Sequence, residues 1–140
     1  MTDLSAFQPL TNDNVEALYA YVFAPWVRGQ GLRDFNVSEG RASAILPYDA
    51  EQAFFSGAIC GQALMSAIDT VAAIAMFTTD RIAKGTAYQH TQFLRAAKAD
   101  AFLIETDVLR FGQGSAYAET SVKDAQTGRL IARASSEFAF

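Results

Sequence analysis

Apolar residues recur at helical spacing near the start of the chain, where they occupy Val15, Leu18, Tyr19 and Val22. This stretch follows four residues of the kind that cap helices, at 11–14, and Pro25 closes it. Side chains three and four residues apart lie on one face of a helix, and proline is disfavoured in a helix interior. The pattern therefore predicts a short amphipathic helix.

A second and denser apolar stretch runs from Gly57 to Thr78, is dominated by Ala, Leu, Met and Ile, and contains no proline. We predict a central helix of roughly 20 residues, about 30 Å long. Because it is apolar on nearly every side, other elements must surround it.

The remaining pattern is that of strands. Leu32 to Leu46 contains two β-like runs that flank Glu39-Gly40, which predicts a hairpin. Four more strand-like runs follow the helix, at Thr86–Leu94, Ala101–Phe111, Ser115–Lys123 and Arg129–Phe140. A hairpin, one long buried helix and then an antiparallel meander make an α+β fold, with a curled sheet wrapped around the helix.

Composition restricts the class of protein. The 140 residues are 51% hydrophobic and 19% charged, as expected for one folded domain, and the net charge of -4 argues against a nucleic-acid partner. One cysteine, Cys60, and one histidine, His90, are too few for a zinc site, so we expect no metal. The N-terminus shows no secretory signal, and we expect a cytoplasmic protein.

Asp69 is the most informative residue, because it lies in the middle of the apolar helix. With Gln62, Ser66 and Thr70 it forms one polar stripe, which predicts a cavity wall or a subunit contact and argues against a membrane span. A buried carboxylate needs compensation. Asp69 is either a structural acid, satisfied by Ser66, Thr70 or a neighbouring strand, or a general base or nucleophile.

Gly61 lies close to the start of the same helix. The unpaired N–H groups of a first helical turn can hold a developing oxyanion, and glycine lets a carbonyl approach closely; alternatively, Gly61 only eases the loop into the helix. Eight residues separate Gly61 from Asp69, a rise of about 12 Å. If the two cooperate on one carbonyl, they come from two copies of the chain, which predicts a dimer.

The segment Cys60-Gly-Gln-Ala-Leu-Met-Ser-Ala-Ile-Asp-Thr-Val-Ala resembles the helix of the phenylacetic-acid-degradation (PaaI-type) thioesterases, which have the hot-dog fold. That family reads His-Gly-Gly, six mostly apolar residues and then Asp-Thr-Ala. The resemblance continues in Thr91-Gln-Phe-Leu-Arg-Ala-Ala, in the turn at Gly112 to Gly114 and in the last strand from Gly128.

The resemblance implies a single hot-dog domain over 1–140, with an N-terminal helical segment at 1–30 and the core at 32–140. It implies hydrolysis of aromatic or medium-chain acyl-CoA by a homodimer or a dimer of dimers, with no separate cofactor, since coenzyme A is part of the substrate. Asp69 would act as base or nucleophile, and the partner's Gly61 N–H would polarise the thioester. Arg95 and Lys98 would contact the CoA phosphates, with solvated surface charges as the alternative reading.

Three residues depart from the family pattern. Cys60 replaces its histidine, Gln62 replaces its second glycine, and Phe54 falls where the family has Asn or Gln. Gln52 or Ser56 could take that place only if the loop is shifted. We expect substrate contacts from the polar stripe and from Cys60, Phe54 and Arg95.

Three alternative functions stay open. The first is an acyl-CoA-binding or sensor module with the same fold. The second is a hot-dog dehydratase, for which His90 is poorly placed. The third is a structural protein.

Overall fold

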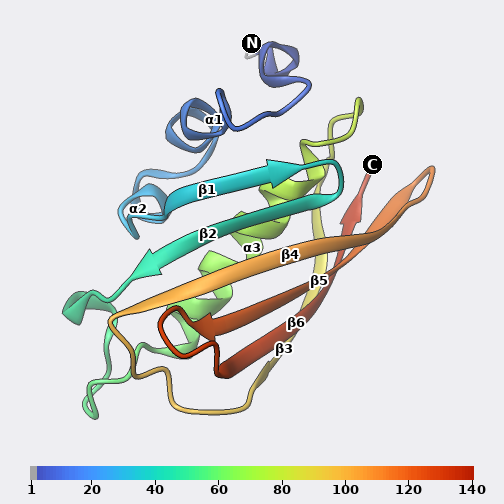
Figure 1. The fold of residues 1–140 in the computed structure, drawn as a ribbon. Coiled ribbons are helices and arrows are strands. Elements are labelled where there is room, and N and C mark those ends of the chain that lie inside the picture. The colour runs from blue at the N-terminus through green and yellow to red at the C-terminus, as the bar shows by residue number, and fades with distance from the viewer. Residues whose placement is uncertain (1–2) are drawn as a thin grey trace.

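The computed structural model describes residues 3–140, and its first paired strands form the predicted hairpin (Figure 1). Strands β1 (Arg33–Ser38) and β2 (Arg41–Pro47) are antiparallel, with Val37 opposite Ala42. Gly40 has a φ of +72° in the intervening turn. Glycine adopts this left-handed conformation at no steric cost, which is why the chain reverses there.

The central helix, α3 (Gly61–Met76), has 16 residues and is shorter than the predicted Gly57–Thr78. The prediction was wrong at 57–60, because these residues belong to a loop in which Gly57 has a φ of +86°. A β-bridge between Ala53 and Ile59 closes this loop and holds its backbone away from helical geometry. Apolar composition alone could not reveal this bridge, which joins residues on opposite sides of the loop.

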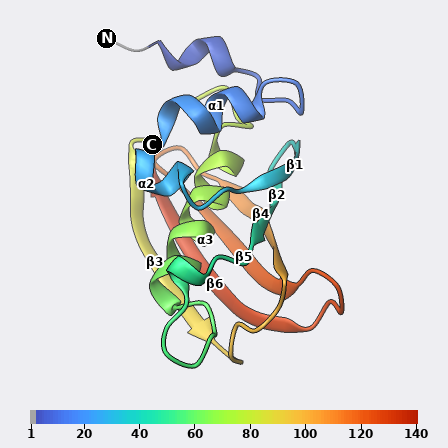
Figure 2. The ribbon, with the colours of Figure 1, turned by 90° about the vertical axis from the view of Figure 1, so that its left-hand side faces the viewer.

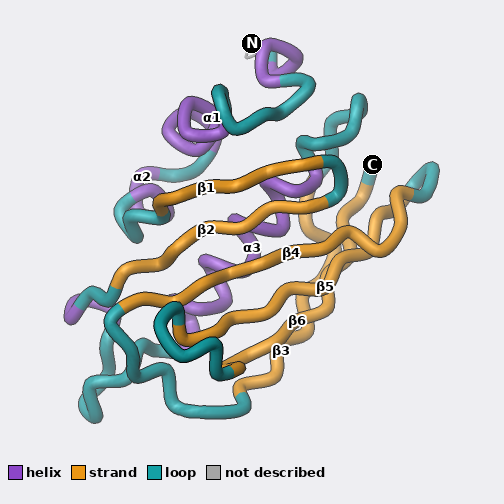
Figure 3. Tube along the Cα trace, viewed as in Figure 1, coloured by secondary structure: helices purple, strands orange, loops and turns teal. Residues whose placement is uncertain are grey.

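Four longer strands complete one antiparallel sheet, and their positions agree with the prediction. They are β3 (Gly85–Phe93), β4 (Ala101–Phe111), β5 (Ser115–Asp124) and β6 (Leu130–Ala139). The order in the sheet is β1-β2-β4-β5-β6-β3 (Figure 3). A simple meander would have placed β3 beside β4, so that part of the prediction was wrong. Instead β2 pairs with β4, and β3 lies at the far edge beside β6.

The sheet curves around α3, so that β1 lies on one side of the helix and β3 on the other (Figure 2). Alternate residues of the central strands point inward and are buried, as Ala118, Thr120 and Val122 are in β5. Val122 packs in one cluster with Ile68 and Ile74 of the helix, and Ala118 packs in a second cluster with other apolar residues of the helix. The predicted architecture, a long helix wrapped by a curved antiparallel sheet, is confirmed.

The N-terminal part of the described chain carries short helices. They are η1 (Leu4–Phe7), α1 (Val15–Val22) and α2 (Pro25–Arg28), and η2 (Ala50–Gln52) follows β2. The predicted amphipathic helix is α1. The side of α3 that the sheet does not cover faces α2. Within residues 3–140, no helix is both long enough and apolar enough to span a membrane.

Candidate functional site

The polar stripe of α3 lines a cavity of about 420 Å³ that is bordered by residues of α2 and of the edge strand β3. Gln62, Ser66, Asp69 and Thr70 all contribute to its surface. Their spacing brings them to one side of the helix, while the apolar residues between them pack against the sheet. The sequence pattern therefore corresponds to a real surface beside α3.

Asp69 is partly buried at this cavity and accepts one hydrogen bond, from the Thr86 hydroxyl of β3, at 2.6 Å. The neighbouring strand thus supplies a partner for the carboxylate, as one reading of the sequence allowed. Ser66 and Thr70 bond elsewhere: Ser66 Oγ donates to Gln30 at 2.8 Å, and Thr70 Oγ1 donates to the Ser66 carbonyl at 2.8 Å. A carboxylate has room for several hydrogen bonds, so Asp69 can accept another from a molecule in the cavity.

Gly61 is the first residue of α3, whereas the sequence indicates only that it lies close to the helix start, and it lines a different cavity of about 510 Å³. The preceding Cys60 occupies the N-cap position without capping the helix through its side chain. Phe54, Phe93 and Arg95 line the same cavity. A Cβ atom at position 61 would lie 3.1 Å from the Phe93 ring, so only glycine fits without displacing it. Asp69 and Gly61 of one chain therefore open onto separate cavities.

Sequence reasoning missed a polar network that joins the N-terminal segment to α3. Gln30 is 5% exposed, and its side-chain amide donates to the Ala63 carbonyl at 3.0 Å and to Gln52 Oε1 at 3.1 Å. The Gln52 carbonyl in turn accepts a hydrogen bond from the Cys60 N–H at 2.9 Å. These contacts join residues distant in sequence, and no local motif could have revealed them.

Gln52, a member of this network, lies beside the start of the helix. Gln52 lines a third cavity, of about 400 Å³, together with Cys60, Gln62 and Trp26. Ser56 lies in the loop that the Ala53–Ile59 bridge closes, and its hydroxyl accepts a hydrogen bond from the Ala58 N–H at 3.4 Å. Gln52 is thus an amide residue upstream of the helix that shares a cavity with Cys60 and Gln62.

Three cations meet at a fourth cavity, of about 440 Å³, where the end of β3 approaches the β5–β6 turn. Arg95 and Lys98 were singled out from the sequence, whereas Arg129 was not. Arg95 uses one guanidinium nitrogen to donate to the Leu130 carbonyl at 2.8 Å. Asp124 also lines this cavity, and hydrogen bonds to its carboxylate, first from the Gln126 backbone N–H, lower its pKa. The predominant charge at the cavity is positive.

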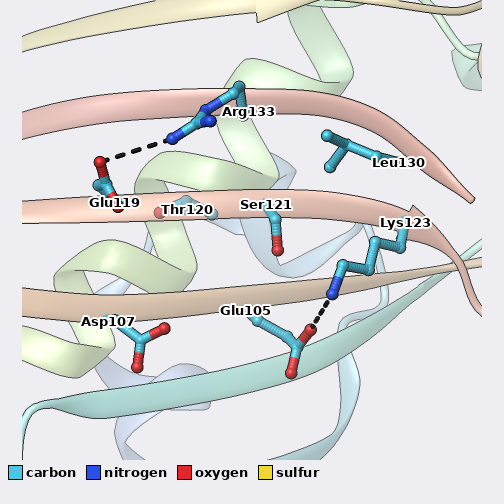
Figure 4. Close-up of a pocket in the computed structure, with 8 residues that line it drawn as sticks. All are labelled: Glu105, Asp107, Glu119, Thr120, Ser121, Lys123, Leu130 and Arg133. Carbon is cyan, nitrogen blue, oxygen red and sulfur yellow. Dashed lines mark hydrogen bonds and ion pairs between the residues drawn. The ribbon is translucent and has the colours of Figure 1, made fainter. Parts of the chain in front are cut away.

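A fifth depression lies on the outer face of the sheet (Figure 4). Its charges are already paired: Lys123 lies 3.3 Å from Glu105, and Arg133 lies 3.5 Å from Glu119. Such exposed pairs are typical of a solvated sheet surface. We therefore place the candidate site on the helix side.

The one cysteine and the one histidine of the chain lie on different elements. Cys60 is a free thiol at the start of α3, and His90 is exposed on β3. Among residues 3–140, no group of three or more His, Cys, Asp and Glu side chains is arranged to hold a metal ion.

Comparison with known proteins identifies relatives. A family model described as the thioesterase superfamily matches residues 57–131, which span α3 and the strands through the start of β6. A protein of Saccharolobus solfataricus named "Putative esterase" is 35% identical over 104 residues, which cover 74% of each chain.

Solved structures share the fold. The Escherichia coli PaaI protein from the phenylacetic acid degradation operon superposes with a TM-score of 0.80 and 19% identity, over 91% of this chain and 90% of that one. A hypothetical thioesterase of Streptococcus pneumoniae, solved with coenzyme A, has a TM-score of 0.71 and 15% identity, over 76% of this chain and 83% of that one. The predicted hot-dog fold is confirmed.

Proposed function

Because the chain belongs to the thioesterase superfamily, we propose that it hydrolyses acyl-CoA thioesters with Asp69 as its catalytic carboxylate. The observation that carries this proposal is the position of Asp69. It is a carboxylate on an otherwise apolar helix, held by one hydrogen bond from Thr86 and open to a cavity.

The carboxylate would act on water in the cavity. Asp69 takes a proton from the water as the water oxygen bonds to the thioester carbonyl carbon, and the carbonyl electron pair moves onto its oxygen. Collapse of this intermediate breaks the C–S bond, and the departing thiolate takes the proton back from the carboxyl group. Direct attack by Asp69 on the carbonyl, followed by hydrolysis of the anhydride, would give the same products.

The oxyanion would be held by the Gly61 N–H of a second copy of the chain. On one helix the two groups are about 12 Å apart, too far to bind one carbonyl. The first-turn N–H groups of α3 have no partner within the helix, and they carry partial positive charge. A partner subunit would bring its Gly61 N–H to the Asp69 carboxylate, which the Gly61 of the same chain cannot reach.

The edge strand β3 supports this assembly. Among the described strands it pairs only with β6, and Tyr88 and Phe93 are about half exposed along it. Long unprotected edges favour pairing with another chain. In an antiparallel self-pairing centred between Gln89 and His90, Thr86, which holds Asp69, would lie opposite the partner's Phe93. Phe93 is the residue that contacts Gly61 in each copy.

The cationic cavity would receive the phosphates of CoA. It shares Arg95 and Ala96 with the Gly61 cavity, so the two form a continuous path from the helix start to Lys98 and Arg129. Clustered cations are the groups that phosphates need. No cofactor beyond the substrate is required by this chemistry.

Thiol release from a panel of acyl-CoA esters tests the proposal. We expect hydrolysis of aromatic and medium-chain esters, which a thiol reagent detects as released CoA. Substrate-free controls measure the reaction of the reagent with the free thiol of Cys60, and this background is subtracted. Binding of these esters by the wild type without thiol release would refute hydrolysis and favour the binding or sensor module.

The shared site is tested by mixing two inactive variants. Asp69→Asn keeps an intact Gly61, and Gly61→Val keeps an intact Asp69, so a mixed dimer contains one complete site. Co-refolding the two variants should restore about a quarter of the wild-type activity if subunits exchange at random. Activity that stays at the level of the separate variants, although mixed dimers form, would refute the shared site.

A further inference from the structure

Trp26 is the one tryptophan of the chain, and it lies on α2 beside the cavity of Asp69. Its side chain is 68% exposed. It lines both the Asp69 cavity and the adjacent Cys60 cavity, and Gln62 is the only other residue that the two cavities share. The indole therefore lies at the boundary between the carboxylate and the start of α3.

Hydrogen bonds of residues on both sides of Trp26 attach its segment of the chain to the rest of the molecule. Before it in the chain, the Tyr19 hydroxyl donates to the Val27 carbonyl at 3.0 Å. After it, the buried Gln30 donates to the Ala63 carbonyl at 3.0 Å and accepts from Ser66 at 2.8 Å. Ala63 and Ser66 belong to α3, so the helix that bears Asp69 also positions the segment that bears Trp26. The backbone that carries the indole is therefore fixed before a ligand binds, which lowers the ordering cost of binding.

The lining of the Asp69 cavity indicates which part of a substrate it takes. Phe23, Trp26, Val27 and Met65 supply apolar surface, and Asp69 is the only charged residue among those that line it. A cavity without cations is unsuited to phosphate, whereas the cations lie at the other end of the site. Its volume of about 420 Å³ falls in the range of small-molecule sites.

We propose that Trp26 determines acyl-group specificity: the acyl group packs against its indole, and a flat aromatic ring is preferred over a short aliphatic chain. Stacked or edge-to-face rings attract each other beyond the contribution of buried area, which acetyl cannot exploit. The inference rests on the proposed function for the identity of the ligand. It adds a residue from the N-terminal segment, outside the span that the family model matches.

Kinetics on a pair of substrates test the assignment. Trp26→Ala should lower kcat/KM for phenylacetyl-CoA by about tenfold and leave acetyl-CoA within about twofold, whereas Trp26→Phe should keep most of the preference. Tyr117→Ala is the matched control, because Tyr117 is a 40% exposed aromatic on β5, away from the Asp69 cavity. Equal losses on both substrates, or no loss on either, would overturn the assignment.

Fluorescence provides a second readout that does not depend on turnover. Since Trp26 is the sole tryptophan, its emission should change on addition of a non-hydrolysable phenylacetyl-CoA thioether and stay constant with CoA alone. An emission change without any hydrolysis would refute the proposed function and keep the Trp26 contact. Hydrolysis of aromatic esters with unchanged emission on thioether binding would refute the Trp26 contact and keep the proposed function.

Discussion

Asp69→Asn is the most direct perturbation of the proposed chemistry. Asparagine has nearly the same shape as aspartate, and its carbonyl oxygen can still accept the 2.6 Å hydrogen bond from Thr86. The substitution removes the negative charge of the group that accepts this hydrogen bond. This changes the free energy of unfolding by about 1 kcal/mol. Because Asp69 is only partly buried and lies outside the packed core, the variant should fold.

The effect on the reaction should be far larger than the effect on folding. An amide cannot take a proton from water or form the acyl anhydride, so kcat should fall by at least about a hundredfold, or about 2.7 kcal/mol of barrier. Substrate affinity should change little, because the acyl and phosphate contacts remain. Thiol release at saturating substrate measures kcat, and thermal unfolding of the same sample measures stability.

Asp107→Asn is the matched control. Asp107 is an exposed carboxylate on the outer face of the sheet, 3.1 Å from Arg41, and its loss should leave turnover unchanged. If Asp69→Asn keeps activity within about threefold of the wild type while the fold is intact, Asp69 is not the catalytic group. If both variants lose activity equally, the effect reports net charge rather than chemistry.

Three further results are expected. Thr86→Val should lower kcat by about tenfold with little change in KM, because the carboxylate loses its only orienting donor among the described residues, and Thr86→Ser should restore kcat; a Val variant as active as the wild type would exclude this orienting role. Arg129→Ala should raise KM for acyl-CoA several-fold at unchanged kcat, with a larger effect at low salt, and a salt-independent KM would contradict phosphate binding. Burial raises the pKa of Tyr19 above its ordinary value of 10.0, so the fold favours the neutral phenol. The contribution of the Tyr19 hydroxyl to the attachment of α2 is complete below pH 10.0 and is lost as pH rises through the raised pKa. Trp26 emission should therefore shift in that pH range in the wild type but not in Tyr19→Phe.

Several parts of the fold could be predicted because they depend on neighbours in sequence. The hairpin around Gly40, the helix at Val15–Val22 and the strand Ala101–Phe111 follow from turn residues and from the spacing of apolar side chains. The start of α3 and the position of β3 could not be predicted in this way. Both depend on pairing between distant segments, the Ala53–Ile59 bridge and the β3–β6 ladder.

The sequence by itself determined the polar stripe of α3 and the presence of a carboxylate within it, because residues three and four positions apart lie on one side of a helix. Only the tertiary structure decided that Thr86 holds Asp69, that Gln52 rather than Phe54 faces Cys60, and that Trp26 lies beside the carboxylate. These contacts join helix, loop and edge strand across long separations in the chain. Their geometry arises from the packing of the curved sheet and the N-terminal segment around one helix, which no local pattern encodes.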